Sequence, residues 1–356
     1  MAIVLYLLLF AVLFNGQSAT VLANPVYYLI DIIPFGMALR LRAYKKKYDE
    51  YWVINLAIVA GLFQSILAII SFLVPALQTF FVDKMVAYGY SDVYLTLSAF
   101  RMYGFASSLT SSTPIFQTLL AIISLYLASK KGTRYYLYAI VLFFSAVINA
   151  RVTIVIALIG ILVLIFLGKN TFKKKLILVC GVIVIVALIV GFCLPFLKDK
   201  SPLTYAWLMN GIKEINFLYS TNNYSGSYSY MSYITDSERL SLPKGISLFV
   251  GEGYSIMTST NPSGFQSDIG YICDIWLGGL FYVLLVYTIF IRMMAKLIKT
   301  KEFLKFFVGI VFLACIPIIN IKGVAFSMNT FMNYLVIFYV AVYSGGQSAN
   351  REVKRW

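Results

Sequence analysis

Two arginines in this 356-residue chain lie beside long apolar segments and are suited to bind an anion. Arg151 occurs in Asn149-Ala150-Arg151, between two apolar runs that almost no loop separates. Arg101 precedes a glycine and a stretch rich in serine and threonine that continues to Thr113. A planar guanidinium group matches phosphate oxygens in pairs, and hydroxyl groups and N–H groups at a helix start supply further donors. These residues therefore predict a site for a phosphate-containing group.

Each of these basic residues also has a simpler explanation. An arginine at a helix end often extends its side chain to the membrane interface, and Arg101 could be a surface residue of a serine-rich linker. An arginine at membrane depth costs at least a few kcal/mol unless it finds partners, which favours a functional role for Arg151. Arg239 and Lys322 are weaker candidates of the same kind. Two acidic residues adjoin Arg239, so an ordinary surface ion pair is the alternative there.

Two carboxylates are candidates for a general base. Glu252 lies between Gly251 and Gly253, and glycines permit close approach of the backbone to another group. Asp268 directly precedes an apolar run, and its alternative role is to cap the helix that starts there. A carboxylate can accept the proton of a hydroxyl group as a new bond forms. We therefore expect Glu252 or Asp268 to act on a sugar hydroxyl or to pair with an arginine.

Tyrosines recur through a stretch rich in serine and asparagine, which includes Tyr224, Tyr228 and Tyr230. Aromatic rings beside hydroxyl and amide groups suit a carbohydrate, because a sugar offers both an apolar face and hydrogen-bonding groups. Tyr271, just after Asp268, is a fourth candidate for sugar contact. The alternative is the belt of tyrosines that forms at membrane interfaces, and it explains most of the 27 tyrosines.

Several kinds of chemistry are excluded by residues that the sequence lacks. There is no histidine, so imidazole bases and histidine-ligated metals are excluded. There is also no phosphate-binding glycine loop, no Asp-x-Asp motif and no Cys-x-x-Cys motif. The four cysteines all lie in apolar runs and are expected to be small core residues. We predict neither a cofactor nor a metal ion.

The composition places these residues in a membrane protein. Hydrophobic residues make up 61% of the chain, charged residues 12%, and the mean hydropathy is +0.85. A soluble domain carries about 25% charged residues, so a soluble enzyme is excluded. A membrane helix needs roughly 20 mainly apolar residues. We predict an all-α polytopic membrane protein with about ten transmembrane helices, near residues 2–15, 23–40, 52–74, 112–129, 135–150, 152–168, 176–197, 269–291, 304–320 and 328–345. Asp31 and Pro34 predict that the second span is irregular.

Charge predicts the orientation of these spans. Basic clusters follow every second span, at residues 40–47, 130–134, 169–175, 292–305 and 351–355. The positive-inside rule then places both termini in the cytoplasm, and the net charge of +15 is a topology signal and not a sign of nucleic-acid binding. Residues 75–111 and 198–268 remain outside, the latter as a large extracytoplasmic loop of a single membrane domain, 1–356. Because the inner loops are short, we expect the functional site outside.

These features resemble the Wzy-type O-antigen and capsular polysaccharide polymerases, which belong with the O-antigen ligases to a branch of the GT-C glycosyltransferases. The span count, the cytoplasmic termini and the large outer loop before the last three helices match over nearly the whole chain. The local matches are Arg101-Met102-Tyr103-Gly104-Phe105, Asn149-Ala150-Arg151, Gly251-Glu252-Gly253, and Ser267-Asp268-Ile269-Gly270-Tyr271 with Gly278-Gly279.

The resemblance implies an enzyme of the bacterial inner membrane that serves lipopolysaccharide or capsule biosynthesis at the outer leaflet. It would move a growing glycan from undecaprenyl pyrophosphate onto a hydroxyl of the next lipid-linked repeat unit. Arg101 and Arg151 would bind the pyrophosphate, with Arg239 or Lys322 as helpers. The implied partners are undecaprenyl-pyrophosphate-linked glycans, membrane lipid and a chain-length regulator protein, with no nucleic acid. The related ligases rely on a late outer histidine, so a ligase is disfavoured.

A transporter or flippase of lipid-linked oligosaccharide is the alternative, because it would also combine many spans with buried arginines. Transporters often carry internal repeats and broken helices, and no repeat of one half in the other is visible in this sequence. The charged candidates also gather on one predicted face, as expected for an enzyme that acts on one side. A structural or assembly protein of the membrane is a third option, and it would not need arginines at helix ends.

Overall fold

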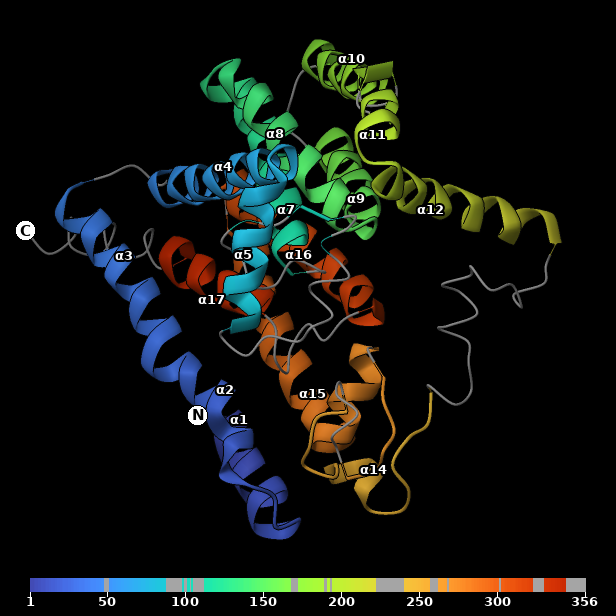
Figure 1. The fold of residues 1–356 in the computed structure, drawn as a ribbon. Helices are drawn as coiled ribbons and strands as arrows, with labels where there is room; N and C mark the ends of the chain where they lie inside the picture. The colour runs from blue at the N-terminus through green and yellow to red at the C-terminus, as the bar shows by residue number, and fades with distance from the viewer. Residues whose placement is uncertain are drawn as a thin grey trace, which may run out of the picture. The chain divides into compact units, whose positions relative to one another are not determined.

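The computed structural model describes residues 1–47, 51–87, 98, 101–102, 104, 112–167, 172–188, 191–192, 194–221, 240–256, 262–267, 269–300, 302–322 and 330–343. Every regular element among these residues is a helix, as predicted (Figure 1). The chain divides into two compact units. Unit 1 comprises Met1–Asn55 and Tyr230–Trp356, and unit 2 comprises Leu56–Ser229.

Unit 2 is built around α7 (Ser112–Lys131), whose residues from Ser112 to Ala128 are almost all buried. α7 forms a tightly connected hairpin with α8 (Arg134–Asn149), and α9 (Val152–Leu167) also packs against it. Buried hydroxyls in the middle of α7 are tolerated because they donate to carbonyls one turn earlier, as Thr118 does to Pro114. The remaining helices of this unit are α4 (Trp52–Leu73, which starts in unit 1), α5 (Pro75–Ala87), α10 (Phe172–Leu188), α11 (Leu194–Lys200) and α12 (Pro202–Thr221).

Unit 1 joins the two ends of the chain. Its N-terminal part contains α1 (Ala2–Leu7), the π-helix η1 (Leu8–Phe14), the 3-10 helix η2 (Ala19–Leu22), α2 (Ala23–Tyr27), the π-helix η3 (Tyr28–Ile32) and α3 (Ile33–Lys45). Its C-terminal part contains α14 (Ser247–Val250), α15 (Gly270–Ile298), α16 (Phe303–Lys322) and α17 (Thr330–Tyr343). α3 packs closely on α17, where a Cβ on Gly36 would lie 3.0 Å from Cβ of Val340.

The predicted irregularity of the second span is confirmed. Asp31 lies in the π-helix η3, which interrupts the α-helical path between α2 and α3. Pro34 lies in the first turn of α3, where a missing backbone N–H costs little. A π-turn inside an α-helix is a local departure that frequently accompanies functional sites.

Five helices are long and apolar enough to cross a membrane, and each corresponds to a predicted span: Ala19–Lys45, Trp52–Leu73, Ser112–Lys131, Gly270–Ile298 and Phe303–Ile321. Four shorter apolar helices lie at other predicted spans: Ala2–Phe14, Arg134–Asn149, Val152–Leu167 and Met332–Ala341. The span expected at 176–197 overlaps α10, which ends at Leu188, and α11, which begins at Leu194. The described residues are consistent with a helical membrane protein and include five helices of spanning length, and the count of ten spans stays a prediction.

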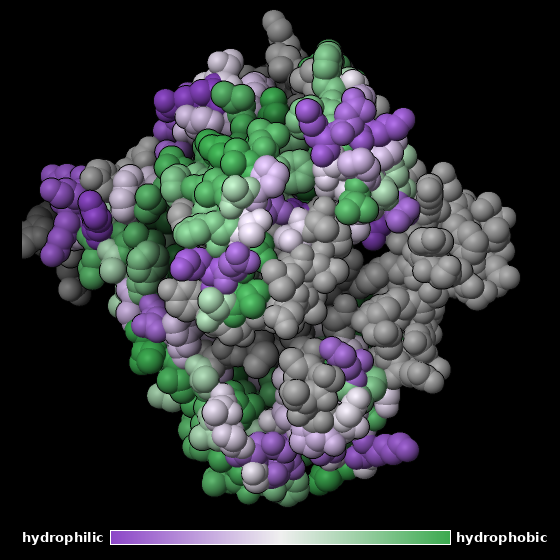
Figure 2. Space-filling view, in the orientation of Figure 1, coloured by the Kyte–Doolittle hydropathy of each residue, from purple (hydrophilic) through white to green (hydrophobic). Residues whose placement is uncertain are grey.

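The surface of α4 is apolar, as expected for a helix that faces lipid. Val59 and Phe63 are 60% and 59% exposed, and Figure 2 shows apolar surface over this helix and a hydrophilic patch at the end of α3.

The expectation that the cysteines are small core residues is wrong for one of them. Cys180 on α10 is exposed, whereas Cys273 on α15 is buried as predicted, because α10 turns the face that carries Cys180 away from the interior of its unit.

Candidate functional site

Arg101 and Arg151, the two arginines predicted to bind an anion, meet at one aromatic ring in unit 2. The guanidinium carbon of Arg101 lies 5.4 Å from the centroid of the Trp207 ring, and that of Arg151 lies 5.1 Å from it. A cation within about 6 Å of an indole ring is attracted by the electron-rich face. We call Arg101, Arg151 and Trp207 the arginine–tryptophan site.

The turn between α8 and α9 fixes the position of Arg151. α8 ends at Asn149, Ala150 is extended, and α9 begins at Val152. The carbonyl of Ala150 accepts hydrogen bonds from both the N–H and the hydroxyl of Thr153, at 3.1 and 2.6 Å. The turn is therefore as short as the sequence predicts, and Arg151 is held at a helix end with its side chain partly buried.

Asn149 attaches the segment of Arg101 to this turn. Its Oδ1 atom accepts a hydrogen bond of 2.9 Å from the N–H of Met102. Met102 is itself buried among Ala68, Ile148 and Leu197, which come from three different helices. From the other side, Nε2 of Gln78 on α5 donates to the carbonyl of Arg101 at 3.0 Å. These bonds explain how two arginines that are 50 positions apart in the sequence reach the same ring.

Helix α12 provides the surface on which Arg151 lies. Trp207 and Gly211 are four positions apart and therefore share one face of the helix. A Cβ on Gly211 would lie 2.8 Å from Cδ and 3.0 Å from Nη1 of Arg151, so a larger residue there would require the arginine side chain to shift. Neither of these α12 residues was predicted as part of the site. Their spacing, Trp-x-x-x-Gly, could have indicated one helix face, but the segment was predicted to be a loop and is helical.

The sequence around the two arginines is basic. Residues 93–198, which contain both arginines, include no aspartate and no glutamate. The helix that carries Trp207 does contain an acidic residue, Glu214.

Glu252 lies in unit 1, at a place where three glycines let two backbone segments touch. A Cβ on Gly251 would lie 2.5 Å from Cα of Gly278, as the glycine pattern around Glu252 predicts for a close backbone approach. The N–H of Glu252 donates to the carbonyl of Trp276 at 2.8 Å, and Asn15 donates to the carbonyl of Gly251 at 2.8 Å. The backbone of Glu252 is therefore held firmly, with its carboxylate partly exposed.

The carboxylate of Glu252 also acts on a neighbouring tyrosine. Burial raises the pKa of the Tyr254 hydroxyl, and the negative charge of Glu252 raises this pKa further. Tyr254 packs on Trp276, with ring centroids 5.9 Å apart.

α15 is broken at Gly279, which the sequence analysis did not foresee. Gly279 has φ +70° and ψ −175°, a conformation that residues with a side chain rarely adopt, and a Cβ there would overlap the backbone of Phe249. The carbonyl groups near the break have new partners, because Tyr6 donates to Gly278 at 2.6 Å and Glu252 donates to Trp276. Other chain segments thus satisfy the carbonyls that a break inside a membrane helix exposes.

A buried polar group close to this break was also missed. Asp274 on α15 is 1% exposed and Asn320 on α16 is fully buried. Nδ2 of Asn320 donates to Oδ2 of Asp274 and to the hydroxyl of Tyr287, both at 3.1 Å. An ionisable side chain inside a membrane helix is by default a functional candidate, and the sequence pattern did not single out Asp274.

Tyr271, predicted to contact sugar, lies at the start of α15. Its ring stacks on that of Tyr287 at 6.1 Å, and its hydroxyl donates to the carbonyl of Pro317 at 2.9 Å. Pro317 lies inside α16. Tyr271 is thus engaged in packing α15 against α16, and its partly exposed ring is the portion left for a ligand.

The structure brings Arg101 and Arg151 together and places Glu252 and Tyr271 in unit 1. Arg239, Asp268, Tyr224, Tyr228 and Tyr230 lie outside the described residues. Lys322 is the last residue of α16, and its side chain is outside the described part. The N-cap residue of α15 is Ile269, whose N–H donates to the hydroxyl of Ser267 at 3.2 Å.

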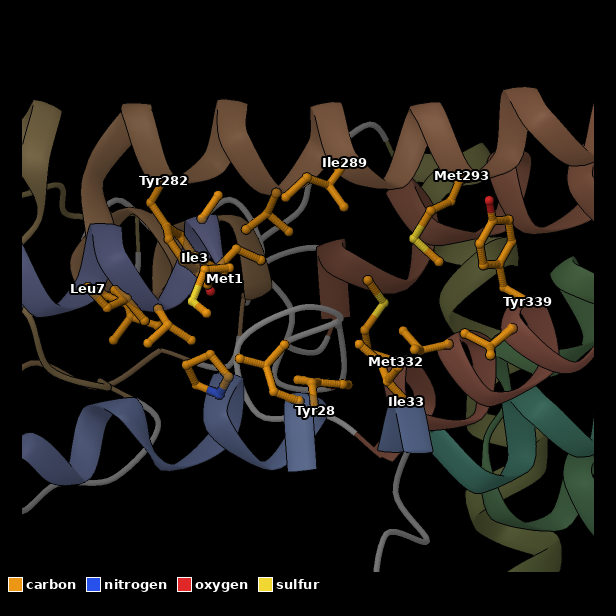
Figure 3. Close-up of a pocket in the computed structure, with 18 of the residues that line it drawn as sticks. Met1, Ile3, Leu7, Tyr28, Ile33, Tyr282, Ile289, Met293, Met332 and Tyr339 are labelled. Carbon is orange, nitrogen blue, oxygen red and sulfur yellow. The ribbon is translucent and has the colours of Figure 1, made fainter. Parts of the chain in front are cut away.

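Unit 1 also contains an apolar pocket with a volume of about 290 Å³. Figure 3 shows side chains of α1, η3, α15 and α17 directed into this space, among them Leu7, Tyr28, Tyr282 and Met332. Tyr28 of the π-helix η3 lines this pocket, as do Leu277 and Tyr282 on either side of the α15 break. A pocket lined in this way suits a hydrocarbon chain.

Comparisons of the chain with protein-family models, with curated proteins and with solved structures find no match.

Proposed function

We propose that the protein is a membrane glycosyltransferase that polymerises undecaprenyl-pyrophosphate-linked repeat units at the outer leaflet of a bacterial inner membrane. The observation that carries this proposal is the convergence of Arg101 and Arg151 on Trp207. Scattered arginines would have pointed to separate interfacial roles, whereas a pair on one ring can act on one ligand.

The chemistry of the leaving group explains the need for two cations. When the bond between the anomeric carbon and the diphosphate oxygen breaks, the electron pair leaves with the diphosphate. Fixed cations aimed at this developing charge lower the barrier more effectively than mobile water. Guanidinium groups suit the role because they remain charged and bind phosphate oxygens in pairs.

The acceptor needs a group that takes the proton of its hydroxyl as the glycosidic bond forms. Glu252 is our candidate for this base, because its backbone is held in place while its carboxylate stays accessible. The partly exposed ring of Tyr271 offers a surface for a sugar ring in the same unit.

The α7–α8 hairpin is consistent with action on the outer side. Its connection carries Lys130, Lys131 and Arg134, and its other end carries Arg151. The 16 residues of α8 separate these ends by about 24 Å. By the positive-inside rule the three basic residues face the cytoplasm, and Arg151 is then close to the opposite boundary.

The apolar pocket of unit 1 supports a lipid-linked substrate. An isoprenoid chain is a flexible hydrocarbon, and the lining of this pocket is almost entirely apolar. An enzyme whose substrate carries such a chain gains from being embedded in the membrane.

The proposal is tested with purified protein and an undecaprenyl-pyrophosphate-linked repeat unit, with separation of the products by length. Wild-type protein should yield a ladder of polymers. Arg151→Ala and Arg101→Ala should each lower the rate by about 100-fold or more, as loss of a transition-state donor does in other enzymes.

Arg134→Ala is the matched control. Arg134 also lies over an aromatic ring, that of Tyr135 at 5.4 Å, but at the opposite end of α8. It should retain the full ladder. Wild-type rates in both Arg101→Ala and Arg151→Ala would reject the proposed role of the pair.

A transporter of lipid-linked oligosaccharide is the second candidate, and the interrupted helices of unit 1 favour it. α15 is broken at Gly279 and the neighbouring α16 contains Pro317, while Asp274 and Asn320 lie buried nearby in sequence. Broken helices and buried carboxylates are frequent in transporters. Movement of the labelled lipid-linked unit across liposomes without any polymer would favour this candidate.

A further inference from the structure

The first turn of α7 contains two buried hydroxyl groups. Ser112 is fully buried and Thr113 is 6% exposed. Among the residues that the structure describes, neither Oγ of Ser112 nor Oγ1 of Thr113 has a hydrogen-bond partner. Buried hydroxyls normally find a partner, so two adjacent exceptions indicate a place where a ligand supplies the acceptor.

The packing of α7 against α8 places Thr113 level with Asn149. A Cβ on Gly61 would touch both Leu120 of α7 and Leu142 of α8, so these leucines lie at one height. Thr113 precedes Leu120 by seven residues, and Asn149 follows Leu142 by seven residues. Because α7 and α8 run in opposite directions, both residues lie the same distance above this contact.

The packing of α7 against α9 places Arg151 at the same level. A Cβ on Gly160 of α9 would overlap the side chain of Ile122 on α7. Thr113 precedes Ile122 by nine residues, and Arg151 precedes Gly160 by nine residues. α7 and α9 run in the same direction, so the start of α7 and the turn that carries Arg151 lie at one height.

We infer that the start of α7 is a second phosphate subsite beside the arginine–tryptophan site. The N–H groups of Ser112 and Thr113 in the first helical turn have no partner within the helix and carry a partial positive charge, whereas Pro114 has no N–H. Ser112 and Thr113 add two hydroxyl donors to them. Donors of this kind, with arginines at the same level and no acidic residue in 93–198, suit the oxygens of a phosphate.

This inference rests on the proposed function, in which the ligand carries a diphosphate group. Each of the two phosphates then has its own set of donors. The arginines hold one phosphate, and the first turn of α7 holds the other. The site should therefore select a diphosphate over a monophosphate on the same isoprenoid chain.

The test measures binding of farnesyl diphosphate and farnesyl monophosphate to the purified full-length protein in detergent. Wild-type protein should bind the diphosphate at least about tenfold more tightly, the usual effect of one or two charge-assisted hydrogen bonds. The double variant Ser112→Ala/Thr113→Val should lower this ratio to about two, with the affinity for the monophosphate unchanged. Arg151→Ala should weaken the binding of both probes.

The control is Ser124→Ala, which removes another buried hydroxyl from α7. Ser124 already donates to the carbonyl of Leu120 at 2.8 Å, so its loss should not change the ratio. Loss of hydroxyls without a protein partner should leave the thermal unfolding temperature of the double variant unchanged or raised. If the double variant does not fold, Thr113→Val alone serves as the test.

A diphosphate preference that survives in the Thr113→Val and double variants overturns the subsite, and so does a wild-type protein that does not distinguish the two probes. If the variants lose the diphosphate preference but wild-type protein yields no polymer ladder in the assay above, the subsite is supported and the polymerase is rejected. The two proposals therefore fail in different measurements.

Discussion

The two units hold their polar groups in opposite ways. In unit 2, Arg101 and Arg151 lie over the ring of one indole, in a stretch without acidic residues. In unit 1, Asp274 lies inside a helix, with the amide of Asn320 as a donor. A pair of cations on an aromatic surface is suited to receive a charged ligand from outside. A carboxylate that the chain itself provides with donors is suited to hold two helices in register.

The two units also differ in the kind of atoms that make their close contacts. Close contacts in unit 1 depend on glycines, since Gly251, Gly278 and Gly279 bring the segment after α14 against the broken α15. In unit 2, the close glycines meet side chains and not backbone, as Gly160 meets Ile122 and Gly211 meets Arg151. Substitutions should therefore damage folding in unit 1 and ligand binding in unit 2.

The largest effect is expected for Gly279→Ala. A Cβ there meets the backbone of Phe249, and the positive φ is strained for alanine, so the free energy of unfolding should fall by about 3 kcal/mol or more. Thermal unfolding in detergent measures this loss. Gly16→Ala is the control, because Gly16 has φ +63° with no atom within 4 Å and should cost only about 1 kcal/mol. Equal losses would mean that the α15 break is not a tight contact.

Asn320→Ala should come next. It removes a donor from a buried carboxylate and should lower the free energy of unfolding by about 2 kcal/mol. A double-mutant cycle with Asp274→Asn isolates the pair, and we expect a coupling of about 1 kcal/mol. No coupling would show that Asp274 does not depend on Asn320.

Trp207→Ala should reduce the polymerisation rate by about tenfold with little change in unfolding temperature, because the indole orients both guanidinium groups. Trp207→Phe retains an aromatic face and should recover most of the activity. An alanine variant as active as wild-type protein would show that the ring does not position the arginines.

The smallest effect concerns Tyr254. Its pKa is raised above the usual value of about 10, so its contribution to stability is complete below this value and is lost as the pH rises through the folded pKa. Glu252→Gln removes the negative charge and should lower the pKa of Tyr254. Ultraviolet titration of the wild-type and Glu252→Gln proteins, each compared with a Tyr254→Phe counterpart, measures the change. An unchanged pKa would show that the carboxylate does not act on this hydroxyl.

Local features of the fold were predictable from the sequence. Apolar runs predict the helices. Almost no residues separate the two apolar runs beside Arg151, so the connection between the helices must be tight. Asp31 and Pro34 interrupt an apolar pattern, and the helix there is irregular. Glycines on both sides of Glu252 predicted a close backbone approach, which Gly278 provides.

Features that depend on distant contacts were not predictable. Arg101 reaches the turn of Arg151 because Met102 bonds to Asn149, and no local pattern indicates that bond. The break at Gly279 follows from the fit of Phe249 against α15, whereas the sequence alone reads as one uninterrupted apolar helix. Contacts between membrane helices are hard to predict from sequence, because lipid-facing and protein-facing positions are both apolar.

The short connection between α8 and α9 has a consequence for how such a chain can diverge. One extra residue between Asn149 and Val152 would lengthen a connection of only two residues and shift the start of α9 from its present position. Arg151 would then leave the indole, and Gly160 would no longer face Ile122. Insertions and deletions should therefore be absent from this connection in functional descendants, while the composition of the lipid-facing surfaces drifts freely.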